Sequence, residues 1–425
     1  MTDRQIEKDE QIYQLSTLVA GRFSLQEVLD KLAEAAVKIT EVKACSIRLL
    51  DEESGDLKMR STYGLSEEYR NKGVVSKEDD VIKAAFAGQA VVLDDMRLDG
   101  RVKYKEATVK EGLVSQLTVV MQFRSKPIGV LRLYSPRPIC FDEDDISLAR
   151  AVASQCAVAI TNARLYAEAI EGARIAEQMR LAGVIQRRMI PQKAPQIPGL
   201  DIAAAYIPCF DVGGDFYDFW PITDKCLAVA IADVIGKGIP AAIMMSMFRG
   251  AARAYTDTKG GADSIGQIID CLNKTACREC RDGEFISLFY AVIDAENMNV
   301  TYCNCGHEPA VLIRGQTVTE LDKGGLVLGV EPEIEYEIDK IEIKNGDSLL
   351  FYTDGLVDAA DFNGEFWGRE SLFETAKKLT ADSAELMVKN ILLYRRRFVG
   401  LASQFDDTSM IVVRAKGPAE PKSGN

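Results

Sequence analysis

A long helical repeat divides this chain of 425 residues into two parts. Between Ile146 and Met189, apolar residues recur at alternating intervals of three and four, the spacing of a coiled-coil seam. The repeat weakens at Arg174 and Glu177, and three prolines then end it: Pro191, Pro195 and Pro198. Its first half can equally pack on the domain before it, whereas its continuation beyond Ala167 favours a helix that joins two domains in a parallel dimer.

Helix-like and strand-like patterns alternate before this repeat. Apolar spacing predicts a helix over Leu25–Ile39, and Asp142 lies where the N-cap of the next helix belongs. The predicted strands are Ala44–Leu50, Leu57–Tyr63, Leu117–Phe123 and Pro127–Tyr134. The polar break at Arg124–Lys126 predicts a hairpin between the last two strands.

The region from Leu200 to Arg414 is rich in short strand patterns. The predicted strands are Asp201–Tyr206, Cys226–Ala232, Ser287–Asp294, Val300–Asn304, Ala310–Ile313, Ser348–Thr353 and Thr408–Arg414. Helices are predicted over Pro240–Tyr255, Ser264–Cys277, Arg369–Leu379 and Ser383–Phe398. Many short strands with helices between them predict an antiparallel α+β domain rather than a βαβ nucleotide-binding fold.

Composition limits the classes of ligand and of metal site that this chain can form. The formal net charge of −13 argues against binding of nucleic-acid phosphates. With neither a signal-like N-terminus nor an apolar stretch long enough to span a bilayer, we expect a cytoplasmic protein without membrane contact. A single histidine excludes His-rich zinc and two-His iron centres, so any metal must be held by carboxylates, carbonyls or cysteines.

Four aspartates lie at predicted strand ends beside glycine or another acid: Asp215, Asp233, Asp354 and Asp406. Converging carboxylates repel one another and raise each other's pKa, and a divalent cation removes that cost. Mg²⁺ and Mn²⁺ prefer such oxygen ligands. Each aspartate taken alone predicts only a turn.

Seven blocks in order resemble the bacterial SpoIIE/RsbU branch of the metal-dependent PPM (protein phosphatase 2C superfamily) serine/threonine phosphatases. They are Gly213–Asp218, Ala232–Ala242, Phe285–Tyr290, Asn304–His307, Gly324–Gly329, Tyr352–Asp358 and Asp406–Asp407. Ile185–Pro191 matches the helix that leads into that family's domain, and the resemblance covers about Ile175 to Lys416. The first region is similar to a GAF sensor domain in its element order and its Phe141–Asp142 helix start.

These resemblances imply an α+β protein: a GAF α/β sandwich, a long connecting helix and an αββα sandwich. The expected boundaries are a GAF domain at 13–163, a helical coiled-coil linker at 164–192, a phosphatase domain at 193–416 and a disordered tail at 417–425. The expected partners are a second copy, bound through the GAF domain and the linker, and a small-molecule ligand of the GAF domain. The family also suggests a phosphorylated anti-sigma-factor antagonist of the STAS type as substrate.

The phosphatase resemblance further implies two Mn²⁺ or Mg²⁺ ions per site. Asp233 would bridge both ions, Asp215 and the backbone carbonyl of Val234 would complete the first, and Asp354 and Asp406 would hold the second. Water held there would attack phosphoserine or phosphothreonine without a covalent intermediate. Support or turn roles suit three further acids: Asp218, Asp358 and Asp407.

Other features have less support. His307 could be a general acid, but a turn histidine held by hydrogen bonds is favoured. It superficially forms a zinc set with Cys277, Cys280, Cys303 and Cys305, although the matching family motif binds no zinc.

Two rival functions remain open. The Gly213–Tyr217 block invites comparison with the Gly-Gly-Asp-Glu-Phe motif of diguanylate cyclases, but Phe216 replaces the catalytic glutamate. The other rival is a metal-free pseudophosphatase that acts as a dimeric scaffold. The presence of all four predicted aspartate ligands counts against it.

Overall fold

The computed structural model describes residues 24–417, and these fall into two compact units that divide after Ile175. The expectations for residues 13–23 and for the tail after Gly417 lie outside the described residues. No helix in the described range is long and apolar enough to cross a membrane.

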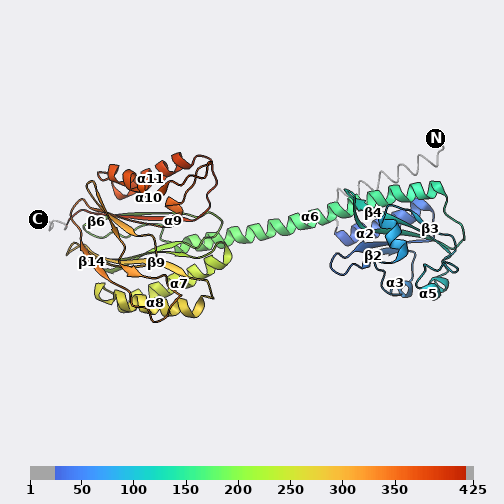
Figure 1. The fold of residues 1–425 in the computed structure, drawn as a ribbon, viewed down its shortest axis with the longest axis horizontal. Helices are drawn as coiled ribbons and strands as arrows, with labels where there is room; N and C mark the ends of the chain where they lie inside the picture. The colour runs from blue at the N-terminus through green and yellow to red at the C-terminus, as the bar shows by residue number, and fades with distance from the viewer. Residues whose placement is uncertain (1–23, 418–425) are drawn as a thin grey trace, which may run out of the picture. The chain divides into compact units, whose positions relative to one another are not determined.

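The first unit is built on a five-stranded antiparallel sheet with the strand order β2-β1-β5-β4-β3. Its strands are β1 (Ala44–Leu50), β2 (Leu57–Tyr63), β3 (Val91–Leu93), β4 (Ser115–Phe123) and β5 (Lys126–Ser135). Its helices are α2 (Leu25–Thr40), α3 (Glu67–Arg70), α4 (Asp80–Phe86), α5 (Lys105–Lys110) and α6 (Glu143–Met189). One sheet face packs against α2 and the first part of α6, and residues of α3 and α4 pack on the other (Figure 1).

Local chemistry accounts for the boundaries in this unit. Arg124 and Ser125 both have positive φ, 47° and 64°, as a two-residue hairpin turn of type I′ requires. Asp142 caps α6, because its Oδ1 accepts the backbone N–H of Asp145 at 2.9 Å while Asp145 Oδ2 accepts that of Asp142 at 3.2 Å. The predicted hairpin and N-cap are confirmed, and Lys126 already belongs to β5.

The second unit contains two sheets packed face to face, and their strands pair antiparallel except for β13, which pairs with β10 in parallel. The six-stranded sheet has the order β13-β10-β9-β8-β7, with β14 also paired to β10, and the five-stranded sheet has the order β12-β11-β15-β16-β6. Its strands are β6 (Leu200–Ile207), β7 (Phe216–Thr223), β8 (Cys226–Val234), β9 (Ile286–Asp294), β10 (Asn299–Cys305), β11 (Ala310–Arg314), β12 (Thr317–Leu321), β13 (Gly324–Gly325), β14 (Asp339–Glu342), β15 (Ser348–Tyr352) and β16 (Thr408–Ala415).

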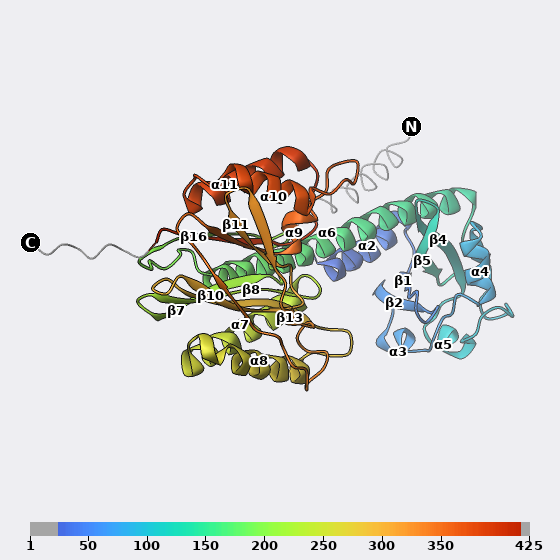
Figure 2. The ribbon, with the colours of Figure 1, turned by 60° about the vertical axis from the view of Figure 1, so that its left-hand side comes forward.

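Helices cover both outer faces of this pair of sheets (Figures 1 and 2). They are α7 (Ile239–Lys259) and α8 (Ile265–Glu279) on the six-stranded sheet, and α9 (Asp354–Val357), α10 (Gly368–Lys378) and α11 (Ala384–Val399) on the five-stranded sheet. A third core lies between the sheets. The predicted αββα sandwich is therefore confirmed.

The structure decides one alternative and adds elements that the sequence patterns missed. The first half of the long repeat is core, since Ala149, Ala153, Cys156 and Ile160 are fully buried against the sheet of the first unit. Further along α6, Ile170 is 53% exposed. The missed strands include β7, because its first five residues are all buried and show no alternation.

Candidate metal centre

The four predicted aspartates lie at one end of the sandwich, two from each sheet. Asp215 directly precedes β7 and Asp233 lies near the end of β8, and these strands are neighbours in the six-stranded sheet. Asp354 begins α9 just after β15, and Asp406 lies two residues before β16 in the five-stranded sheet. Antiparallel pairing within each sheet brings these strand ends together.

Burial and mutual repulsion disfavour negative charge in this cluster. Burial raises the pKa of Asp215, which is 1% exposed, and repulsion from Asp233 adds to the rise. Burial followed by repulsion from Asp354 raises the pKa of Asp233 to about 7. Burial and repulsion from Asp406 raise that of Asp354 to about 6. A positive charge placed among these groups would offset both effects.

The oxygen atoms present suit a hard divalent cation. Asp354 Oδ1 is buried without a hydrogen-bond partner. A Cβ on Gly214 would lie 2.8 Å from the carbonyl oxygen of Val234 and 3.4 Å from Asp233 Oδ1, so both oxygens face the space that this glycine leaves. Carboxylate and carbonyl oxygens are the ligands that Mg²⁺ and Mn²⁺ take.

The side chains are not arranged as a closed ligand shell. Across residues 24–417, no group of three or more His, Cys, Asp or Glu side chains is placed to hold a metal ion. Asp406 is engaged in an ion pair, because its Oδ2 lies 2.9 Å from Nζ of Lys237. Metal binding would therefore compete with this ion pair, and the predicted ligand assignment stays a prediction.

The loop before Asp215 is held by two side chains. Asp407 accepts the backbone N–H of Cys209 at 2.8 Å and that of Gly214 at 2.7 Å. Gln186, near the end of α6, donates to the carbonyl of Gly213 at 2.7 Å and accepts its N–H at 3.0 Å. The sequence predicts a support role for Asp407 and places Gln186 in the Ile185–Pro191 block that leads into the domain, without predicting its contact with Gly213.

Thr353 was also missed, although it directly precedes Asp354. Its Oγ1 donates to Asp215 Oδ2 at 2.7 Å and accepts the backbone N–H of Ser409 at 2.9 Å. The hydroxyl thereby links β15 and β16 to the loop that precedes β7. No local signal in the sequence reveals this contact, because 138 residues separate Thr353 from Asp215.

Of the three acids with predicted support roles, Asp218 forms an ion pair with a helix and Asp358 lies at the surface. Asp218 is 1% exposed and pairs with Arg249 of α7 at 2.6 Å. Burial raises the pKa of Asp218 and Arg249 opposes that rise. Asp358 is exposed as a residue, but partial burial of its carboxyl group, followed by repulsion from Glu308, raises its pKa.

His307 is enclosed near β9 rather than open to a substrate. It is 7% exposed, its Nδ1 lies 2.7 Å from Ser287 Oγ, and its backbone N–H donates to Asn304 Oδ1 at 2.7 Å. Burial lowers its pKa to about 4, so the ring is neutral near pH 7. Two cysteines of the superficial zinc set, Cys303 and Cys305, are buried in the core, and their Sγ atoms lie 3.9 Å apart.

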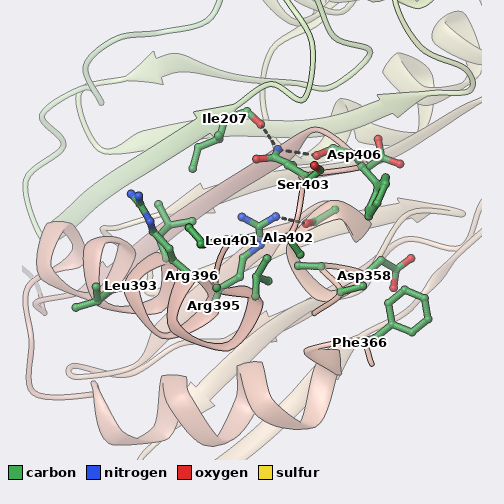
Figure 3. A pocket seen from close by; sticks show the side chains of 18 of the residues that line it. Ile207, Asp358, Phe366, Leu393, Arg395, Arg396, Leu401, Ala402, Ser403 and Asp406 are labelled. Atoms are coloured by element: carbon green, nitrogen blue, oxygen red, sulfur yellow. Dashed lines mark hydrogen bonds between the residues drawn. The ribbon is translucent and has the colours of Figure 1, made fainter. Parts of the chain in front are cut away.

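A cavity of about 940 Å³ lies beside the carboxylate cluster, and Asp358 and Asp406 form part of its wall (Figure 3). Apolar side chains from α11 and the following loop line it: Leu392, Leu393, Val399, Leu401 and Phe405. Arg395 also lines it and donates to the carbonyl of Gly355 at 3.2 Å. A cavity of this size accommodates a peptide segment or a small molecule.

Comparison with known proteins finds a matching protein family for each unit. The family model described as Stage II sporulation protein E (SpoIIE) matches residues 223–416, and the GAF domain model matches residues 24–161. The chain is 33% identical over 248 residues to phosphoserine phosphatase RsbU of Bacillus subtilis, covering 57% of this chain and 71% of RsbU. It is 32% identical over 258 residues to protein IcfG of Synechocystis, covering 54% of this chain and 40% of IcfG. The SiaA PP2C domain of Pseudomonas aeruginosa shares the fold, with a TM-score of 0.52 at 19% identity over 57% of this chain and 98% of that domain.

Replacing Asp407 with alanine is expected to lower hydrolysis of p-nitrophenyl phosphate at least about tenfold, since the loop before Asp215 loses two acceptors. Stability should fall by about 1–3 kcal/mol. Asp294→Ala is the matched control, because Asp294 also accepts two backbone N–H groups but lies at the far end of β9. Equal activity losses in the two variants would show that Asp407 has no special link to the site.

Replacing His307 with glutamine is expected to change turnover less than about tenfold, because a neutral, enclosed imidazole supplies no proton. The free energy of unfolding is expected to respond to this substitution more than turnover does. The folded pKa of about 4 lies below the unfolded value of about 6.5, so wild type loses stability as pH falls from about 6.5 to 4. Urea titrations across that range should show a smaller loss in the variant. A hundredfold fall in turnover with intact folding would instead assign His307 the acid role.

Proposed function

Since this chain belongs to the SpoIIE/RsbU family of PP2C-type protein serine phosphatases, we propose that its carboxylate cluster is a metal-dependent site that hydrolyses phosphoserine or phosphothreonine in a regulatory protein. The observation that carries the proposal is the convergence of four aspartates from two sheets, with three carboxyls whose pKa is raised by burial and mutual repulsion. The relative named phosphoserine phosphatase supports the substrate class.

Two Mn²⁺ or Mg²⁺ ions are the proposed cofactors. Asp233 interacts with both Asp215 and Asp354 and would be shared by the two ions. Asp215 and the Val234 carbonyl would help to hold the first ion, and Asp354 and Asp406 the second. When bound, such ions would lower the pKa of the water that they hold and offset negative charge on phosphoryl oxygens. The protein supplies a rigid frame, because each ligand adjoins a strand of the sandwich.

Neighbouring residues have separate proposed duties. Thr353 orients Asp215 through its 2.7 Å hydrogen bond, so that one carboxylate oxygen stays free for a cation. Lys237 holds Asp406 until a cation competes for it, and its ammonium group then becomes available to a phosphate group. Phe216 is fully buried in the core under α7, which disfavours the diguanylate cyclase alternative because that position cannot reach a substrate.

The cavity beside Asp406 is the proposed binding site for the protein substrate. Its apolar wall of Leu392, Leu393 and Leu401 suits the apolar side chains of a folded domain or a loop, and Lys389 and Arg396 also line it. Basic groups at that position would attract a phosphorylated, negatively charged segment. A phosphorylated STAS-type anti-sigma-factor antagonist is the proposed substrate, as the family resemblance suggests.

Regulation is proposed to act through α6. The described part of α6 beyond Ala163 exposes apolar side chains such as Leu165, Ile170 and Leu181, which suits pairing with α6 of a second copy. Near its end, Gln186 is 4% exposed and holds Gly213 by two hydrogen bonds. A signal at the GAF domain that shifts or rotates α6 would move this loop, and with it Asp215, as a shift between populations.

The activity is tested by hydrolysis of p-nitrophenyl phosphate and of a phosphoserine peptide with Mn²⁺. Asp233→Asn should reduce turnover at least about a hundredfold, because the central carboxylate is lost. Asp224→Asn is the control, since Asp224 is an exposed acid in the β7–β8 hairpin. If wild type and Asp233→Asn are equally inactive, the chain is a scaffold and the proposed hydrolysis is wrong.

The regulatory link is tested with Gln186→Leu, which removes both hydrogen bonds to Gly213 and puts an apolar side chain of similar size in their place. Turnover should fall about tenfold or more through misplacement of the loop. Gln178→Leu, at an exposed position on the same helix, should leave turnover unchanged. Sedimentation analysis checks that both variants keep the wild-type oligomeric state. Equal turnover in wild type and Gln186→Leu would refute a link through this residue.

A further inference from the structure

The sheet of the GAF domain has one apolar face and one face with charge at its centre. In the pairing of β1 with β5, Ser46 lies opposite Arg132 and Arg48 lies opposite Val130, so the two arginines are diagonal neighbours on one face. Arg48 is 2% exposed and Arg132 is 7% exposed. The other face, represented by Ile47 and Leu131, is apolar and packs under α2 and α6.

The charge on this face is not neutralised by the protein. Within the described part of the chain, no salt bridge joins Arg48, Arg132 or Lys72 to a carboxylate. The Nε atoms of both arginines and Nη2 of Arg48 are buried without hydrogen-bond partners. Arg48 Nη1 donates to the carbonyl of Leu57 at 3.0 Å. Lys72 Nζ lies 3.3 Å from the ring centroid of Tyr69, a cation–π contact.

The pKa of Lys72 agrees with its position beside two buried arginines. Burial, followed by repulsion from Arg132 and Arg48, lowers the pKa of Lys72 to about 6, although Glu111 opposes the shift. The Glu111 carboxylate is itself engaged, because it accepts the backbone N–H of Ser66 at 2.7 Å. Keeping cations buried and unpaired costs several kcal/mol, and an anion seated among them would offset that cost.

A cavity of about 40 Å³ lies beside Lys72 and Arg132. Lys72 and Arg132 line it together with the hydrogen-bonding side chains of Tyr104 and Gln116. Asp79 is the acid in its wall, and its Oδ2 accepts a backbone N–H at 3.1 Å. Since a buried water needs roughly 10–15 Å³ by this kind of measure, the cavity holds a few waters or one compact polar group.

We propose that this cavity of the GAF domain binds a compact oxyanion, a phosphate or carboxylate group, between Arg132 and Lys72, with Arg48 diagonal to Arg132 on the same face of the sheet. The planar guanidinium of arginine matches two oxygens of such a group, and the lysine adds a third contact. The cavity is too small for a whole nucleotide, so the ligand is an inorganic anion or the anionic end of a small metabolite. The proposal concerns binding alone and does not depend on the phosphatase activity.

Calorimetric titration of the full chain with inorganic phosphate, and separately with acetate, tests the site. EDTA is present to prevent metal-dependent binding at the carboxylate cluster, and sodium chloride keeps the ionic strength constant. Wild type should show saturable binding of at least one anion. Stronger binding of phosphate identifies a phosphate group as the ligand, and stronger binding of acetate identifies a carboxylate.

Arg132→Met should weaken that binding at least tenfold and, without anion, raise the temperature of unfolding, because a buried unpaired cation is removed. Arg97→Met is the matched control, since Arg97 is an exposed arginine paired with Asp95 at 2.6 Å. Arg48→Met gives a second test if Arg132→Met fails to fold. Failure of wild type to bind either anion, or equal binding by wild type and the pocket variants, would overturn the proposal. Hydrolysis of p-nitrophenyl phosphate, measured in parallel with Mn²⁺, reports on the proposed function independently.

Discussion

Repulsion between buried carboxylates is the constraint on which the catalytic half of this protein depends. Two sheets must pack closely to form the central core, and their strand ends then bring Asp215, Asp233 and Asp354 into one poorly solvated region. Hydrogen bonds from Thr353 and an ion pair with Lys237 hold individual carboxylates but do not neutralise the group. A fold that accepts this cost is suited to cation binding.

Both units bring charged side chains together in buried positions, and the two sets of side chains have opposite charge. The phosphatase sandwich gathers acids, and the GAF sheet buries Arg48 and Arg132 on one face without acidic partners. In each unit the remaining cores are apolar, so stability rests on those cores and not on the charged groups. Ligands of the opposite charge would therefore stabilise each unit by binding its folded form.

The sequence predicted most strands and an antiparallel α+β domain, because alternation, turn residues and helix caps are local signals, whereas the αββα class came from the resemblance to the phosphatases. The four aspartates could be predicted as strand-end residues, and the resemblance to phosphatases grouped them. Gln186 and Thr353 could not be found this way, since their partners are distant in sequence: Gly213 and Asp215. The shared face of Arg48 and Arg132 depends on the β1–β5 register, which the spacing of residues does not specify.

Metal binding by the full chain tests this account most directly. Equilibrium dialysis against Mn²⁺, followed by elemental analysis, counts the ions held per chain. Two ions are predicted for wild type, and at most one weakly bound ion for Asp233→Asn, because Asp233 would be shared by both ions. Binding of two ions with unchanged affinity by Asp233→Asn would contradict the account, as would a wild-type chain that binds none.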